Sequence, residues 1–305
     1  MRLWWTALLV VIALAGAGLA VAADRPHNPN SRPELTWRAD RAAQPWISAL
    51  VSELEIVDAH ALQLSRHGRD VLGRLTALDV EGMNTALAAG DPVSAEVTVE
   101  LGRLAILSGQ AEPAVEEWRL GPSTRARFDQ LGVAAASAQQ LTASWQEVGA
   151  HSRRVGGLID SLFRHDGLVF RATTAGRNAN WDDALLLLEQ AKGPLGEATE
   201  IRNGLATRLN TDTLDDLLDR YRSYDAALTA MYAYIRDTGL RDGPDFDVLE
   251  QDVATAQEAL PPNSSAMRVI VAEAAGPPLT DALVAIEAAR GEILEALEPS
   301  DQAQP

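Results

Sequence analysis

Apolar residues recur at alternating steps of three and four along two long stretches of the sequence. This spacing keeps one face of an α-helix apolar over many turns, as in helices that pack lengthwise against one another. The first seam is Ile47, Leu50, Leu54, Val57, Ala61, Leu64, Gly68, Val71, Leu75 and Leu78. The second is Leu131, Ala134, Ala138, Leu141, Trp145, Val148, Ser152, Val155, Ile159 and Leu162, with Val169 in register. The seams predict two long helices.

The first seam predicts a helix of about 45 residues, roughly 65 Å long. We expect it to end at Gly90-Asp91-Pro92, where glycine and proline interrupt the pattern. A short helix over residues 93–107 and a broken connection over residues 109–122 should follow. The second long helix is expected to reach Thr173.

Two seam positions differ from the others in size. Gly68 leaves a gap in the first seam, and Trp145 is the only tryptophan on either seam. Because small and large residues compensate in a packed core, we expect these two to face each other. The pairing assumes that the two long helices run antiparallel, which would place Leu54 opposite Ile159.

Shorter helices are predicted for the rest of the chain, from Trp181 to about Leu209, from Asp212 to Ile235 and from Asp245 to Leu260. Asn180, Asp212 and Asp245 are the expected N-caps, because short polar side chains accept hydrogen bonds from free amides of the first turn.

Proline at two sites should interrupt the later helices. Gly193-Pro194 is expected to kink one helix, and Pro277-Pro278 should separate two final segments.

No alternation of apolar and polar residues is long enough to predict a sheet. The predicted fold is all-α, with long antiparallel helices in an extended bundle or helical-hairpin arrangement, after an N-terminal signal peptide or anchor. We assign a long helical hairpin region to residues 45–175, a shorter-helix bundle region to residues 176–297 and a disordered tail to residues 298–305.

Residues 1–22 are predicted to be a signal peptide or a membrane anchor. No charge occurs from Leu3 to Ala23, and a bulky apolar stretch precedes small residues that end in Ala20-Val21-Ala22. This order is typical of a signal peptide cleaved before Ala23, but about 20 apolar residues could also span a bilayer. Either alternative places the remaining chain outside the cytoplasm, after a tether at residues 23–44. We expect no second apolar run of spanning length.

Composition excludes several classes of function. The chain has no cysteine, which removes disulfides, thiolate catalysis and cysteine-bound metals. Its net charge of −17 disfavours nucleic acid, which requires a basic surface. The same charge disfavours docking on anionic lipid, so membrane contact is expected only through the N-terminal segment.

Polar residues flank the first seam at intervals of one heptad: Glu53, His60, His67, Arg74 and Glu81. The two histidines lie about 10 Å apart along the helix axis, too far for one metal ion with bonds near 2 Å. We interpret the set as a polar stripe beside the core.

Acidic residues surround a Gly-Pro turn near residue 243: Asp242, Asp245, Asp247 and Glu250. Carboxylates in a turn can bind Ca²⁺, but the EF-hand spacing is not met. Capping and stabilisation of the helix dipole explain these positions. No metal and no cofactor is predicted.

All four tyrosines fall within one predicted helix: Tyr221, Tyr224, Tyr232 and Tyr234. Tyrosine combines apolar area with a hydroxyl that needs a partner. Core packing with the hydroxyls at the rim is one interpretation, and a ligand-pocket wall or partner surface is the other. These residues are the candidate site.

Catalytic motifs are missing from the sequence. There is no Gly-x-Ser-x-Gly elbow, Walker loop or His-Glu-x-x-His, and His165-Asp166 has no evident nucleophile partner. We expect an exported, non-enzymatic helical protein that binds a protein partner or scaffolds an assembly at the cell envelope. The alternative is an extracytoplasmic bundle that binds a small molecule or lipid, with residues 221–234 as a pocket wall.

Overall fold

The computed structural model describes residues 33–114, 120–207, 209–261 and 265–298, and these are helical with no strand among them. The predicted all-α class is confirmed. The helices are α2 (Pro33–Thr76), α3 (Val80–Ala114), α4 (Pro122–Ala138), α5 (Gln140–Arg177), α6 (Trp181–Leu205), α7 (Asp212–Thr238), α8 (Pro244–Ala259) and α9 (Ser265–Leu297). The predicted signal peptide or anchor, the first part of the tether and the tail after Glu298 lie outside the described residues.

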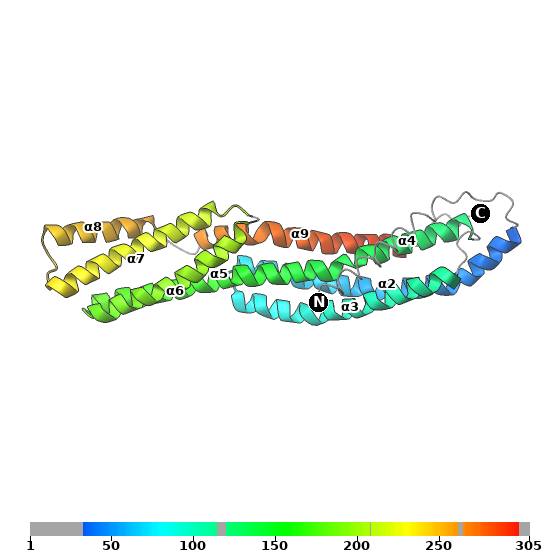
Figure 1. The fold of residues 1–305 in the computed structure, drawn as a ribbon, viewed down its shortest axis with the longest axis horizontal. Coiled ribbons are helices and arrows are strands. Elements are labelled where there is room, and N and C mark those ends of the chain that lie inside the picture. Colours follow the sequence, from blue (N-terminus) through cyan, green and yellow to red (C-terminus); the bar gives the residue numbers. More distant parts are fainter. Residues whose placement is uncertain (1–32, 115–119, 208, 262–264, 299–305) are drawn as a thin grey trace.

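The helices form an elongated molecule (Figure 1). At one end α2, α3, α4 and α9 pack with the first part of α5, and we call this part the body. Beyond the turn between α2 and α3, the second part of α5 continues with α6, α7 and α8, and we call this part the arm. The largest apolar core fills the body, and a second core lies in the arm around Val169, Leu188 and Tyr232.

The first long helix is shorter than its seam predicts. α2 ends at Thr76, and Leu78 takes a left-handed conformation with φ 61°. The side chain of Asp79 then accepts a 2.8 Å hydrogen bond from the backbone amide of Gly82, which caps the start of α3. Gly90-Asp91-Pro92 lies inside α3 instead of ending a helix. The prediction was wrong here because the capping aspartate outweighs a periodic pattern that continues through the turn.

The second seam forms α4 and α5, which are separated only at Gln139. Its members are buried, as are those of the first seam apart from Leu78, which lies in the turn and is only partly buried. The backbone amide of Gly121, just before α4, donates a 2.8 Å hydrogen bond to Asp40 near the start of α2.

Further along both helices, Gly68 of α2 lies against Trp145 of α5. The helices therefore run parallel, because α3 has already returned the chain. The antiparallel pairing of Leu54 with Ile159 was wrong in direction.

Trp145 is packed from two sides. A Cβ placed at Gly68 would lie 3.9 Å from Trp145 Cζ3, so the predicted proximity is confirmed, although such an atom would first overlap the side chain of Leu283 in α9. The glycine directly on the indole is Gly90 of α3, where a Cβ would overlap the ring. The indole Nε1 donates a 3.0 Å hydrogen bond to Asp91 Oδ1.

Helix starts differ from the predicted caps at two of three positions. Asn180 precedes α6 at the expected position, but its side chain accepts no hydrogen bond from the first turn; its Nδ2 donates to Asp183 Oδ2 instead. Thr211 precedes α7, so Asp212 is its first residue. Gly243, with φ 100°, precedes α8 and places Pro244 in the first turn, where proline lacks an amide that would be unpaired anyway. Asp245 therefore lies within the first turn and not at the cap.

Prolines and the predicted tether also behave differently from expectation. α9 continues through Pro277-Pro278, and α2 already begins at Pro33, inside the segment assigned to the tether. Trp37 stacks with Arg41, whose guanidinium carbon lies 5.3 Å from the ring centroid. The first part of α2 was assigned to the tether because it has no regular apolar face that would predict a helix.

Among the described helices, α9 is long and apolar enough by length and composition to cross a membrane. The expectation of no second run of spanning length is therefore corrected. The same composition suits a central core helix, and Ile270, Val271 and Ile286 are buried where α9 packs between α2, α4 and α5.

Candidate functional site

The predicted tyrosine surface of α7 faces the interior of the molecule. Tyr221 and Tyr232 are buried, and Tyr224 and Tyr234 are partly exposed. The Tyr232 ring lies against Gly176 of α5, where a Cβ would come within 2.6 Å of Cζ, and its centroid is 5.7 Å from that of Trp181. At least two of the four tyrosines therefore pack helices together.

A buried group of ionisable residues lies beside Tyr221, and we call it the His165 cluster: His165, Asp166, Tyr221 and Asp225. His165 Nε2 lies 2.9 Å from Asp225 Oδ2, and its Nδ1 lies 3.3 Å from Asp166 Oδ1. The Tyr221 hydroxyl donates to Asp166 Oδ2 at 3.3 Å, and its ring centroid is 4.7 Å from the imidazole. The cluster joins α5 to α7 at the boundary between the two apolar cores.

Electrostatics hold His165 in its charged form. Burial alone would lower the pKa of His165, but hydrogen bonds and charge attraction from Asp166 and Asp225 outweigh it and raise the pKa to about 9. Burial, followed by the charge of Asp166, raises the pKa of the Tyr221 hydroxyl. At neutral pH the cluster therefore holds an imidazolium between two carboxylates, with the phenol protonated.

This arrangement favours a structural role over a catalytic one. His165 is 1% exposed, so a substrate cannot reach the imidazole without local opening. Asp225 Oδ1 is buried with no hydrogen-bond partner among the described residues. The hydroxyl of the cluster belongs to Tyr221, and its raised pKa makes it a poor nucleophile. Sequence reasoning missed the cluster because Asp225 lies far along the chain from His165.

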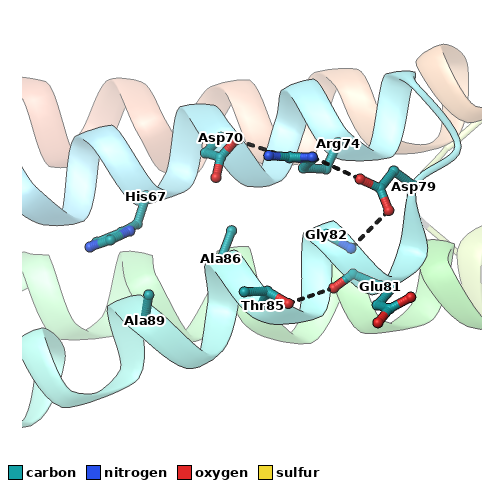
Figure 2. Close-up of a pocket in the computed structure, with 9 residues that line it drawn as sticks. All are labelled: His67, Asp70, Arg74, Asp79, Glu81, Gly82, Thr85, Ala86 and Ala89. Atoms are coloured by element: carbon teal, nitrogen blue, oxygen red, sulfur yellow. Dashed lines mark hydrogen bonds and ion pairs between the residues drawn. The ribbon is translucent and has the colours of Figure 1, made fainter.

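A cavity of about 470 Å³ lies instead between α2 and α3, near their turn. Figure 2 shows Arg74 between Asp70 and Asp79, with Thr85 and Glu81 on the facing helix. Arg74 Nε lies 3.3 Å from Asp70 Oδ1, and Nη1 lies 2.9 Å from Asp79 Oδ2. The polar lining is largely occupied with its own ion pairs, and none of the four tyrosines lines this cavity.

Four members of the predicted polar stripe, Glu53, His60, His67 and Arg74, lie on α2. Glu81 instead lies in the first turn of α3, because the first helix ends at Thr76. His67, Arg74 and Glu81 line the cavity. Further along, His60 Nε2 lies 3.3 Å from Glu96 Oε2, and Glu53 Oε1 lies 3.9 Å from Arg103 Nη1. The stripe therefore connects α2 to α3.

One member of the stripe has an unusual carboxyl group. Burial, and then a hydrogen bond and charge repulsion from Glu100, raise the pKa of Glu53 to about 7. The same hydrogen bond lowers the pKa of Glu100. Glu53 therefore titrates near neutral pH at the contact between α2 and α3.

Within the described parts of the chain, no group of three or more histidine, aspartate or glutamate side chains is arranged to hold a metal ion. Asp245 and Asp247 occupy the first turn of α8, where negative charge stabilises the helix dipole. Searches of family models, curated proteins and solved structures found no match to the chain.

We expect the free energy of unfolding to fall as the pH rises from about 6.5 to about 9. The folded chain holds the His165 proton more tightly than the unfolded chain, where the pKa is 6.5. Its stabilisation is therefore complete below that value and is lost as the pH passes through the folded pKa, a difference on the order of 3 kcal/mol. Urea unfolding across this range measures it.

The control is His165→Gln, which keeps a polar side chain of similar size without the charge. This variant should show a clearly flatter dependence above about pH 8, where Glu53 has largely lost its proton. A variant whose stability declines as steeply as that of the natural chain would contradict the assignment.

Proposed function

We propose that the protein is an exported, non-enzymatic helical protein that binds a protein partner or scaffolds an assembly at the cell envelope. The observation that carries the proposal is a set of large apolar side chains on outward faces of long helices. They occur as pairs one heptad apart, Val99 with Ile106 on α3 and Phe163 with Phe170 on α5, and all four are exposed. Exposed apolar groups in a helical register are typical of surfaces that bind other helices.

A pocket beside the tyrosines would have favoured ligand binding. The rings of Tyr221 and Tyr232 pack between helices, and the 470 Å³ cavity lies elsewhere with a charged lining. Ligand sites are mostly apolar with a few convergent polar groups. These observations support the partner-binding proposal over the small-molecule or lipid alternative.

The proposed location follows from the leader. We expect the mature protein to begin at Ala23 and to be recovered in the soluble exported fraction, because the Ala20-Val21-Ala22 stretch follows the order of a cleaved signal peptide. N-terminal sequencing of the native protein measures this. An intact Met1 terminus in the membrane fraction would show that the leader is retained as an anchor.

Partner binding is tested by placing a photo-reactive amino acid in the chain within its native cells. At Ile106, which is 61% exposed, and at Phe170, it should give discrete covalent adducts. The matched control is the same group at Gln251, an exposed polar position on α8. Adducts of equal yield and identity at the control, or none at either apolar position, would argue against the proposal.

A further inference from the structure

The stripe of α5 that ends in Phe163 and Phe170 begins inside an interface. Trp145 and Gly156 lie on the same side of α5, and α3 covers both: Gly90 contacts the Trp145 ring, and a Cβ at Gly156 would lie 2.9 Å from Met83 Cε and 3.5 Å from Val80 Cγ1. The contact thus moves back along α3 as α5 advances, and it reaches the first residue of α3 at Gly156.

Beyond Gly156 the stripe continues but its cover does not. The chain turns at residues 77–79, so the α2–α3 hairpin ends while α5 runs on into the arm (Figure 1). Phe163 and Phe170 follow Gly156 at one-heptad intervals, about 10 Å and about 21 Å further along the axis. They are 45% and 68% exposed, in positions that face away from the core of the arm.

We propose that this uncovered stripe, Phe163, Gly167, Phe170 and Thr174, is a dimer surface on which α5 packs antiparallel against α5 of a second copy. The proposal rests on the proposed function and names its partner as the chain itself. In this dimer, α5 of the second copy covers the part of the stripe that lies beyond the end of α3.

Symmetry makes the stripe complementary to itself. With a two-fold axis between Phe163 and Phe170, each Phe163 lies at the level of Phe170 of the second copy, and aromatic pairs of this kind favour association. Gly167 lies at the axis, and no atom comes within 4 Å of the place where its Cβ would be. The missing side chain gives the two helices room for close approach.

Charges agree with the same register. Asp160 and Arg171 are exposed on one flank of the stripe. The two-fold axis brings Arg171 of each copy close to the level of Asp160 of the other copy, so the dimer contains two such pairs. Arg177 at the end of α5 reaches the level of Gly156 of the second copy, where α3 begins. By contrast, α8 carries five acidic and no basic residues within Pro244–Ala259, so a symmetric α8 contact would be repulsive.

Sedimentation of the purified protein over a concentration series tests the proposal. We expect a reversible dimer whose dissociation constant rises at least ten-fold in Phe170→Glu, because central aromatic residues dominate such interfaces. Val284→Glu, an exposed apolar position on α9 outside the proposed binding surfaces, should leave the constant unchanged. Helical circular dichroism and melting checks that both variants are folded.

Two further variants fix the register. Because the chain has no cysteine, Gly167→Cys introduces a single thiol at the axis, which should cross-link to itself through a disulfide or a short bismaleimide. The exposed Val284→Cys should not. Arg171→Asp should weaken the dimer, and adding Asp160→Arg should restore it to within about three-fold, since the pair is only reversed.

Several results would overturn the proposal. These are a protein that stays monomeric at all concentrations, a dimer that Phe170→Glu leaves unchanged, or Gly167→Cys that fails to cross-link in a dimer. A monomer whose Phe170 still gives adducts with another protein in cells would refute self-association while leaving the proposed function standing.

Discussion

Replacing Trp145 with alanine should lower the free energy of unfolding by about 3–5 kcal/mol, the range for removing a buried aromatic side chain. Trp145 is 2% exposed and lies where α2, α3, α5 and α9 meet. The change opens a cavity under Gly90 and also leaves Asp91 without the hydrogen bond from the indole. Denaturant unfolding monitored by circular dichroism measures the loss.

The opposite change tests the same contact from α3. Gly90→Ala should destabilise by roughly 1–3 kcal/mol, because the added Cβ meets a rigid ring that has no room to move. Gly102→Ala is the matched control within α3, since its added Cβ meets nothing within 4 Å. It should stabilise by up to about 1 kcal/mol through helix propensity alone. Two alanine variants with effects of the same sign would contradict the predicted packing.

Asp225→Ala is expected to cost about 3–5 kcal/mol at neutral pH, because it leaves a buried charge without its partner. His165 would keep only Asp166, whose side chain is 46% exposed, in place of a buried carboxylate 2.9 Å away. The loss should shrink at high pH as His165 becomes neutral. Unfolding in urea near pH 7 and near pH 10 measures both effects.

Two controls separate burial from charge. Asp237→Ala removes an exposed ion pair on the same helix, 2.8 Å from Arg236, and should leave the free energy of unfolding almost unchanged, because solvent screens exposed charges. The double variant His165→Leu with Asp225→Leu should be more stable than the sum of the single changes, because no buried charge remains. Additive effects would show that the two side chains do not interact.

Much of the helical architecture could be predicted from spacing alone. Leu54, Leu141 and Leu162 lie on seams whose period matches one face of a helix, so their burial follows from local pattern. The direction of helix packing did not follow, because it depended on the turn at Leu78. The turn needs only a left-handed residue, Leu78, and a capping aspartate, Asp79. These leave the apolar spacing unchanged on both sides, so the spacing does not reveal the turn.

The candidate site illustrates a different limit. The tyrosines could be found on one helix, but their surroundings depend on Gly176 and Trp181 from two other helices. The pairing of His165 with Asp225 joins residues that no local pattern connects. Likewise, the sequence does not distinguish Phe163 and Phe170 from core residues, and their exposure follows from where the α2–α3 hairpin ends.

α5 passes without interruption from the body into the arm, a single helix of 38 residues that spans about 57 Å. Tension or torque applied at the far end of the arm therefore reaches the body through one continuous backbone, with the His165 cluster at the crossing point. No turn or break interrupts α5 between Gln140 and Arg177. In mechanical terms α5 is a strut that fixes the spacing between the body and the arm.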